Sequence, residues 1–135
     1  MNTNSKIALA VLAGAALGAA ATQGLRAQAT PPVYYVAEIT VSNPDAYGKE
    51  YAPKAQTIIK AHGGRFVALG GSGGAGAAGK VTAFDGEPPQ RLAVTVWDSM
   101  DKIQAWRADP EYQALRKIGD KYVTFRSFAV EGVSQ

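Results

Sequence analysis

Three stretches of the chain are rich in β-branched and aromatic residues and contain no Gly or Pro, a pattern typical of β-strands. They cover residues 33–41 (VYYVAEITV), 91–98 (RLAVTVWD) and 122–130 (YVTFRSFAV). Apolar residues occupy both alternating sets of positions in each stretch, whereas a strand with one solvated face alternates between apolar and polar. The pattern therefore predicts strands that are covered on both faces. A shorter apolar stretch at 65–69 predicts a fourth strand.

Two helical regions separate these strands. Asn43 and Pro44 form a helix start, and apolar residues then recur at three- and four-residue steps to about Ala61. Pro53 lies inside this pattern and lacks a backbone donor, so we expect a kink or a break there. The second region has two starts, Ser99 and Asp109-Pro110, and predicts helices to about Ala108 and about Ile118.

The middle of the chain has a different composition. Residues 70–79 are mostly Gly and Ala and predict a flexible loop, because they have no large side chain to bury. Lys80–Phe84 is a candidate for a further short strand, with Asp85-Gly86 as the turn of a small hairpin.

The order of elements is strand, helix, strand, strand, helix, strand, the split βαβ pattern. It predicts an α+β fold, a ferredoxin-like βαββαβ sandwich with both helices on one face of a four-stranded antiparallel sheet. The other face carries apolar side chains as well, and an exposed patch of that size normally marks an interface. We therefore expect a homodimer. Glu38 and Arg126 lie on strands that are neighbours in this fold, so we also expect them to face one another.

The first 29 residues have the pattern of a secretory signal peptide. Lys6 precedes an apolar run from Ile7 to Ala21, and Ala27 and Ala29 supply the small residues of a cleavage site. The run is shorter than the about 20 apolar residues that span a bilayer. We expect cleavage after Ala29, export to the periplasm with no remaining membrane anchor, and one mature domain at residues 30–135.

Composition excludes several classes of partner and site. Two of the fourteen basic side chains lie in the leader, so residues 30–135 carry twelve basic and eleven acidic side chains, without a basic cluster for nucleic acid. The chain has no cysteine and one histidine, so thiolate metal sites and disulfides are excluded. We expect neither a cofactor nor a protein-ligated metal.

Several segments resemble one bacterial family. They are AHGGRF at 61–66, Asp85-Gly86, Arg91, DSM at 98–100, Trp106, DPEY at 109–112 and Leu115. Over about residues 34–130 the chain is similar to the domain-of-unknown-function family 1330. The resemblance implies a dimeric α/β-barrel, in which two ferredoxin-like sheets close face to face around a cavity. Residues 72–79 and the leader are additions to the family pattern.

Two interpretations are open for His62. It is the only side chain of the sequence whose ordinary pKa lies near neutrality, which suits a general base beside Arg65. Alternatively, it ends the helix stripe, at the favourable end of the helix dipole, and packs against the sheet.

Glu38 is the second candidate acid or base, because a carboxylate in a poorly hydrated cavity has a raised pKa. The alternative is an ion pair with Arg126 or simple exposure. Aromatic side chains are candidates to line a pocket for a small organic ligand, although a dimer core needs the same residues. They are Tyr35 or Tyr34, Trp97, and Phe125 or Phe128. Tyr112 can point its hydroxyl into such a pocket or hold the restarted helix.

Two functions follow from these candidates. One is a cofactor-independent enzyme for a small organic substrate, with His62 and Glu38 as catalytic residues and Arg65 and Arg126 holding an anionic group. The other is a binding or structural dimer module without turnover. A fold does not decide between them.

Overall fold

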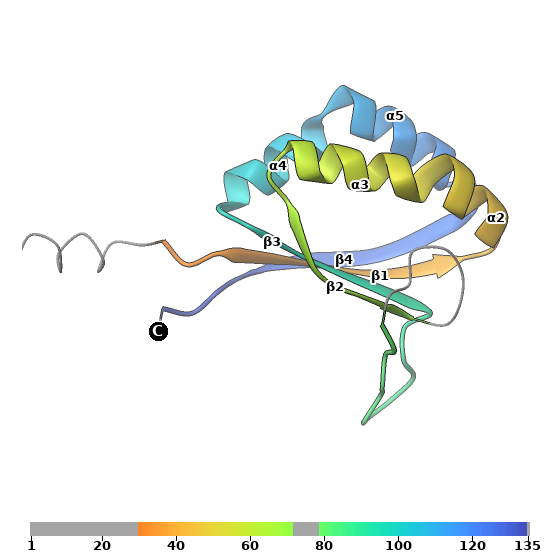
Figure 1. Cartoon of the computed structure of the whole chain (residues 1–135), viewed down its shortest axis with the longest axis horizontal. Helices are drawn as coiled ribbons and strands as arrows, with labels where there is room; N and C mark the ends of the chain where they lie inside the picture. Colours follow the sequence, from red (N-terminus) through yellow and green to blue (C-terminus); the bar gives the residue numbers. More distant parts are fainter. Residues whose placement is uncertain (1–29, 72–78, 135) are drawn as a thin grey trace, which may run out of the picture. The chain divides into compact units, whose positions relative to one another are not determined.

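A four-stranded antiparallel sheet forms the base of the domain (Figure 1). The computed structural model describes residues 30–71 and 79–134, and the expected leader lies outside them. The strands are β1 (Val33–Val41), β2 (Arg65–Gly71), β3 (Arg91–Trp97) and β4 (Val123–Glu131), in the order β2-β3-β1-β4. This order and the antiparallel pairing confirm the ferredoxin-like α+β fold expected from the sequence.

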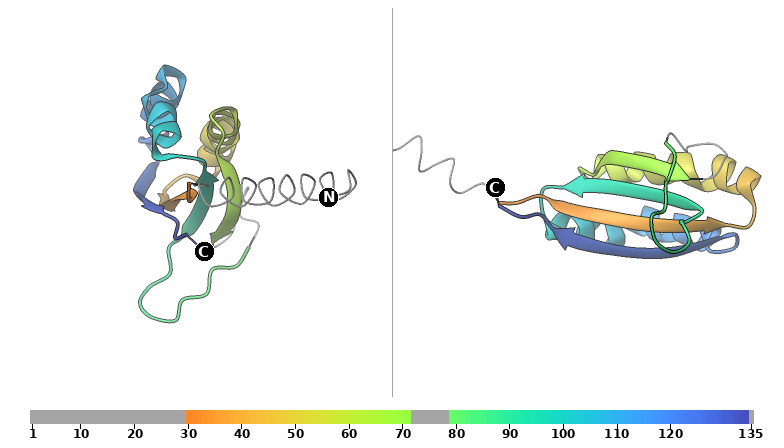
Figure 2. Two further views of the ribbon diagram at one scale, coloured as in Figure 1. Left: turned by 90° about the vertical axis from the view of Figure 1, so that its left-hand side faces the viewer. Right: turned by 90° about the horizontal axis from the view of Figure 1, so that it is seen from below.

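The helical segments all lie on one side of this sheet (Figures 1 and 2). They are α2 (Pro44–Ala46), η1 (Tyr47–Tyr51), α3 (Ala52–Ala61), α4 (Met100–Ala108) and α5 (Pro110–Gly119). Among the described residues, no helix is long and apolar enough to cross a membrane. The sheet therefore has a helix face and an open face, and these two names are used below.

The interruption expected at Pro53 is present as a turn of π-helix. In η1 the backbone N–H of Ala52 donates to the carbonyl of Tyr47, one residue farther back than in an α-helix. Pro53 then falls in the first turn of α3, where its missing N–H is not needed. The wider turn places Tyr47 and Tyr51 in the buried layer.

The helix starts and stops are those that the sequence predicts. The Asn43 side chain accepts a hydrogen bond from the Ala46 N–H, and that of Ser99 accepts one from the Lys102 N–H. Asp109 accepts two, from the N–H groups of Glu111 and Tyr112. Gly63 adopts a φ of 93° after α3, a conformation that favours glycine.

The segment between β2 and β3 corrects two predictions. Gly70 and Gly71 belong to β2 rather than to a loop, while residues 72–78 lie outside the described part. Lys80–Phe84 forms no strand, and the expected hairpin is absent from residues 79–90. These side chains meet no core: Phe84 is 92% exposed, and the segment extends away from the helices (Figure 1).

Strand register decides which side chains share a face. Odd-numbered residues of β1 point to the helix face, where Val33 lies opposite Trp97 and Ala37 opposite Ala93. The core of the domain is packed there. The open face is mostly apolar, as expected, and carries these residues: Tyr34, Val36, Leu92, Val94, Val96, Phe128 and Val130.

Glu38 and Arg126 lie directly opposite each other on the open face. Arg126 Nη1 donates to Glu38 Oε1 at 2.8 Å, so the pairing expected from the sequence is confirmed. The pair lies among apolar neighbours of β1 and β4.

Candidate functional site

A cavity of about 60 Å³ lies between the helix face of the sheet and the helices. Its sheet side includes Tyr35, Ala93 and Phe125, and its helical side includes Tyr51, Trp106 and Tyr112. Most of this wall is apolar. Small-molecule sites have this character, an apolar enclosure with a few polar groups.

Aromatic rings build the wall and hold one another in place. The Trp106 ring contacts Tyr35 edge to face at 5.1 Å, Tyr112 at 4.6 Å and Trp97 in a stack at 5.2 Å, all between ring centroids. The Tyr51 ring packs on Phe125 at 5.6 Å. Such pairs add about 0.5–1.5 kcal/mol each beyond the area they bury, so the wall is well ordered.

Small side chains leave the central space. Ala37 and Ala93 lie opposite each other on β1 and β3, and Ala55 of α3 lines the same cavity. An alanine fills little of the gap between a sheet and a helix layer, so these three alanines leave space that larger residues would close.

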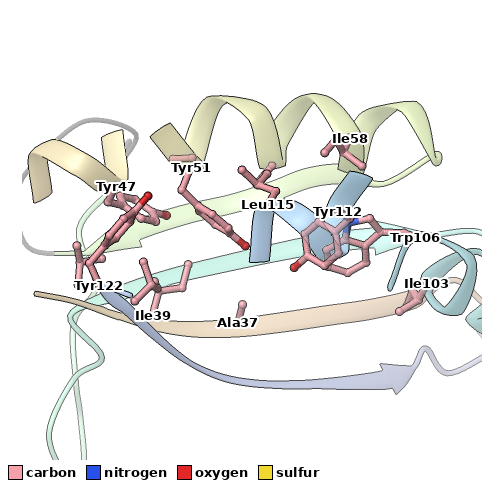
Figure 3. Close-up of a cluster of buried hydrophobic side chains, with 14 of the residues drawn as sticks. Ala37, Ile39, Tyr47, Tyr51, Ile58, Ile103, Trp106, Tyr112, Leu115 and Tyr122 are labelled. Atoms are coloured by element: carbon pink, nitrogen blue, oxygen red, sulfur yellow. The ribbon is translucent and has the colours of Figure 1, made fainter. Parts of the chain in front are cut away.

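Tyr51, Tyr112 and Arg116 form a polar edge of the cavity, and Gln56 and Thr95 are the other polar side chains that line it. The hydroxyls of Tyr51 and Tyr112 point toward one another (Figure 3), and burial and then the neighbouring Tyr112 raise the pKa of Tyr51 above its ordinary value. A tyrosine is protonated at neutral pH even with its ordinary pKa, so the Tyr51 hydroxyl can donate a hydrogen bond. Both rings are buried almost completely.

Arg116 carries the charge at this edge. Burial opposes that charge, but interactions with Tyr112, Tyr51 and Asp120 outweigh it and raise the pKa of the guanidinium. The Nε and Nη2 groups donate to Asp120 Oδ1 at 3.2 and 3.1 Å. The guanidinium lies 4.1 Å from the centre of the Phe125 ring. Arg116 is thus a permanent cation beside an apolar wall.

One buried donor of the wall has no acceptor in the described part of the chain. This is the indole N–H of Trp106, a side chain that is 2% exposed. A buried donor without a partner costs about 1–3 kcal/mol. An oxygen supplied from elsewhere would remove that cost.

Three residues chosen from the sequence line this cavity, Tyr35, Tyr112 and Phe125, whereas the alternatives Tyr34 and Phe128 lie on the open face. Tyr35 also donates to Ser127 Oγ at 2.7 Å. Trp97 lies behind the wall, fully buried against Trp106, and its Nε1–H donates to Thr95 Oγ1 at 2.8 Å. The resemblance placed a cavity between the sheets of two subunits, whereas this one lies within a single subunit on the helix face.

His62 does not line the cavity. It follows the end of α3, and its Nε2 lies 2.7 Å from Asp109 Oδ2 at the start of α5. The hydrogen bond with His62, and then that from the Tyr112 N–H, lower the pKa of Asp109. His62 therefore links the end of α3 to the start of α5, a contact that neither interpretation of this residue included.

The remaining sequence candidates are dispersed. Glu38 and Arg126 lie on the open face, on the other side of the sheet from the cavity. Arg65 Nη1 contacts Asp98 at 3.2 Å on the surface, where Lys102 contacts the same carboxylate at 2.8 Å. Bonds from Lys102 and then Arg65 lower the pKa of Asp98. The structure brings none of these side chains to the cavity.

Among the aromatic and charged residues of the cavity wall, sequence reasoning missed four as site residues: Tyr51, Phe66, Trp106 and Arg116. A signal existed for two of them. Tyr51 lies four residues before Ala55 in one helical stripe, and Arg116 lies four residues after Tyr112 on α5. Among residues 30–71 and 79–134, no group of three or more His, Cys, Asp or Glu side chains could hold a metal ion.

Two solved structures share the fold. SnoaB from Streptomyces nogalater, a cofactor-independent oxygenase, aligns with a TM-score of 0.53 and 13% identity over 78% of this chain and 96% of its own. RPA0582 from Rhodopseudomonas palustris, of unknown function, aligns with a TM-score of 0.56 and 16% identity over 85% and 93%. No curated protein matches the sequence significantly.

At these identities the likeness shows the fold alone. The sequence itself matches one family over residues 32–133, which is most of its length. The chain therefore belongs to the family described as domain of unknown function DUF1330.

Proposed function

We propose that this protein binds a small, largely apolar organic molecule in the cavity between its sheet and its helices. The observation that carries the proposal is the construction of the wall, in which packed aromatic rings surround a space left by alanines. The unpaired Trp106 N–H, together with Tyr112 and Arg116, offers hydrogen bonds to an oxygen of the ligand.

Binding without turnover is the function we favour. Among the described residues, the side chains that line the cavity include no carboxylate and no imidazole. Tyr51 is protonated near neutral pH, as a tyrosine of ordinary pKa already is, and burial raises its pKa further. The wall thus supplies donors and a cation but no base that works near neutral pH, and general-base catalysis requires one.

Cofactor-independent turnover is the second candidate. It is favoured by the shared fold of SnoaB, which is a cofactor-independent oxygenase. A reaction of this kind in the present chain predicts a product, so incubation of the protein with its ligand in air and mass spectrometry of the small-molecule fraction distinguishes the two candidates. An unchanged ligand supports binding alone.

We propose further that the protein works outside the cytoplasm. The support is the leader pattern of residues 1–29. Intact mass spectrometry of protein from the periplasmic fraction should give a chain that starts at Thr30. Retention of the whole leader in that fraction contradicts cleavage.

The open face supports a homodimer. Its apolar side chains are substantially exposed in one copy: Tyr34 is 37%, Phe128 45% and Val130 54% exposed. A second copy of the same face would remove them from water and would enclose the Glu38–Arg126 pairs. An isologous contact of this kind is the commonest form of soluble oligomer.

Native mass spectrometry of the protein purified from the cells that produce it tests the binding function. We expect a co-purifying organic molecule, and its release should change the fluorescence of Trp106. Ala93→Leu fills the cavity and should abolish binding, whereas Ala114→Leu, an exposed position on α5, is the control. Equal ligand retention by wild type and Ala93→Leu contradicts the proposal.

A further inference from the structure

A surface hollow of about 330 Å³ adjoins the cavity beside α5. Two residues, Tyr112 and Arg116, line both spaces. The hollow is completed by Arg107, Gln113, Lys117 and Asp120. The polar edge of the cavity is therefore also the boundary between an apolar interior and a solvated surface.

The hollow is positively charged. It contains three cationic side chains, Arg107, Arg116 and Lys117, and one carboxylate, that of Asp120. The Arg107 guanidinium lies over the rings of Trp106 and Tyr112, 5.8 Å from each centre, and so stays close to the cavity wall. A hollow lined by one sign of charge concentrates ligands of the other sign.

Arg116 lies where the two spaces meet. Its side chain is 24% exposed, against 55% for its partner Asp120. The two bonds to Asp120 end on one oxygen and use the Nε and Nη2 groups, and Arg116 also hydrogen-bonds to Tyr112. A guanidinium has five N–H donors, so Arg116 has donors left for a ligand.

We infer that the ligand of this site is a hydrophobic carboxylate, whose apolar body occupies the cavity and whose carboxylate binds Arg116 and Tyr112 at the edge of the hollow. This inference rests on the proposed binding function and adds the chemical class of the ligand. A planar guanidinium matches a carboxylate with two parallel hydrogen bonds, and such charge-assisted bonds are about twice as strong as neutral ones.

Matched pairs of acids and amides measure how much the charge of the ligand contributes to its affinity. Propionate and butyrate, whose short apolar chains suit a cavity of about 60 Å³, are compared with propionamide and butyramide, which have nearly the same shape but no charge at neutral pH. The fluorescence of the tryptophans at the wall reports binding of each probe. We expect each carboxylate to bind at least about tenfold more tightly than its amide, which corresponds to about 1.4 kcal/mol.

Two substitutions should move the affinity in opposite directions. Arg116→Gln keeps a hydrogen-bonding side chain but removes the charge, and should abolish the preference for acid over amide. Asp120→Asn removes the competing carboxylate and should tighten binding of butyrate several-fold. Lys54→Gln is the control, because Lys54 is exposed on α3 and lines neither space.

The outcomes are distinguishable. If acids and amides bind equally and Arg116→Gln has no effect, the carboxylate assignment is wrong while the cavity function stands. If no probe binds, and no molecule co-purifies with the protein, both the carboxylate assignment and the proposed binding function are wrong. If the acids bind but Ala93→Leu does not weaken them, they occupy only the surface hollow, which overturns the inference.

Discussion

His62 Nε2 lies 2.7 Å from Asp109 Oδ2, and this contact joins the end of α3 to the start of α5. The other oxygen of the same carboxylate, Oδ1, accepts hydrogen bonds from the backbone N–H groups of Glu111 at 2.7 Å and Tyr112 at 3.2 Å. One side chain thus caps α5 and ties it to α3. Because Tyr112 forms part of the cavity wall, Asp109 and His62 act as positioning residues for it.

Asp109→Ser distinguishes the two roles of Asp109, which are to cap the start of α5 and to link α5 to α3 through His62. A serine is also a good N-cap, so α5 should still begin at Pro110, but the contact with His62 is lost. We expect a lower midpoint in urea denaturation and weaker ligand binding, because Tyr112 is less well held. Asp109→Ala, which removes both, should lower the midpoint further. Equal midpoints for wild type and Asp109→Ser would show that the link to His62 carries no stability.

The same carboxylate makes stability depend on pH. The pKa of Asp109 is lowered in the folded state relative to its ordinary value of 3.8. Its contribution is therefore complete above about pH 5, where the carboxyl is ionised in both states, and is lost as the pH falls through the lower, folded-state pKa.

Urea denaturation of wild type and Asp109→Asn between pH 3 and pH 6 measures this contribution. The difference between the two midpoints should be constant above about pH 5 and should shrink in acid. Asp98→Asn serves for comparison, since Lys102 and Arg65 lower the pKa of that exposed surface carboxylate in the same direction. A difference that grows as the pH falls contradicts the assignment.

Thr95→Val tests the hydrogen bond behind the cavity wall. The Nε1–H of Trp97, a fully buried ring, donates to Thr95 Oγ1 at 2.8 Å. Valine has a similar shape but no acceptor, so the indole N–H would be left buried and unpaired, at a cost of about 1–3 kcal/mol. Thr95→Ser keeps the oxygen and is the control. The free energies of unfolding come from urea titrations, and a valine variant as stable as wild type would refute the role of this bond.

Gly119→Ala should lower the free energy of unfolding, whereas the same substitution in an ordinary helix raises it. Replacing glycine by alanine inside a helix normally stabilises it by about 1 kcal/mol. Here a Cβ at position 119 would lie 2.6 Å from Cδ2 of Tyr51, far closer than packing allows. We expect a net loss of about 1–3 kcal/mol and altered ligand binding, because the Tyr51 ring must shift. Calorimetric unfolding decides the sign, and a stabilised variant would show that the ring gives way freely.

The helices and strands of this fold can be predicted from the sequence because the residues that start and end them are close together in the chain. The β1 boundaries follow from an uninterrupted apolar stretch that ends before Asn43-Pro44, and α5 follows from Asp109-Pro110. The strand expected at Lys80–Phe84 is absent because apolar composition alone does not provide a partner strand or a buried face. The pairing of Glu38 with Arg126 could be predicted because the fold makes β1 and β4 neighbours.

The cavity was harder to predict from the sequence, for a physical reason. Its wall combines side chains from all four strands and from four helical segments, so no single stretch contains its pattern. Tyr51 is one residue of a helical stripe, and only the π-helical turn and the packing on Phe125 place it at the wall. The contact of His62 with Asp109 joins residues 47 apart and depends equally on how the helices pack.

Val94→Lys tests the proposed homodimer. Val94 lies near the middle of the open face, opposite Val36 on one side and Ala68 on the other. In a single copy the lysine stem can lie along the sheet and its ammonium can reach water. In a face-to-face dimer the charge would be buried without a partner, which costs several kcal/mol. Light scattering after size exclusion should give twice the chain mass for wild type and one chain mass for Val94→Lys, with unchanged circular dichroism.

Gln104→Lys on the exposed side of α4 adds the same charge away from the open face and should remain dimeric. A wild-type protein that stays monomeric at high concentration would leave the apolar open face without the proposed partner, and the dimer would have to be abandoned.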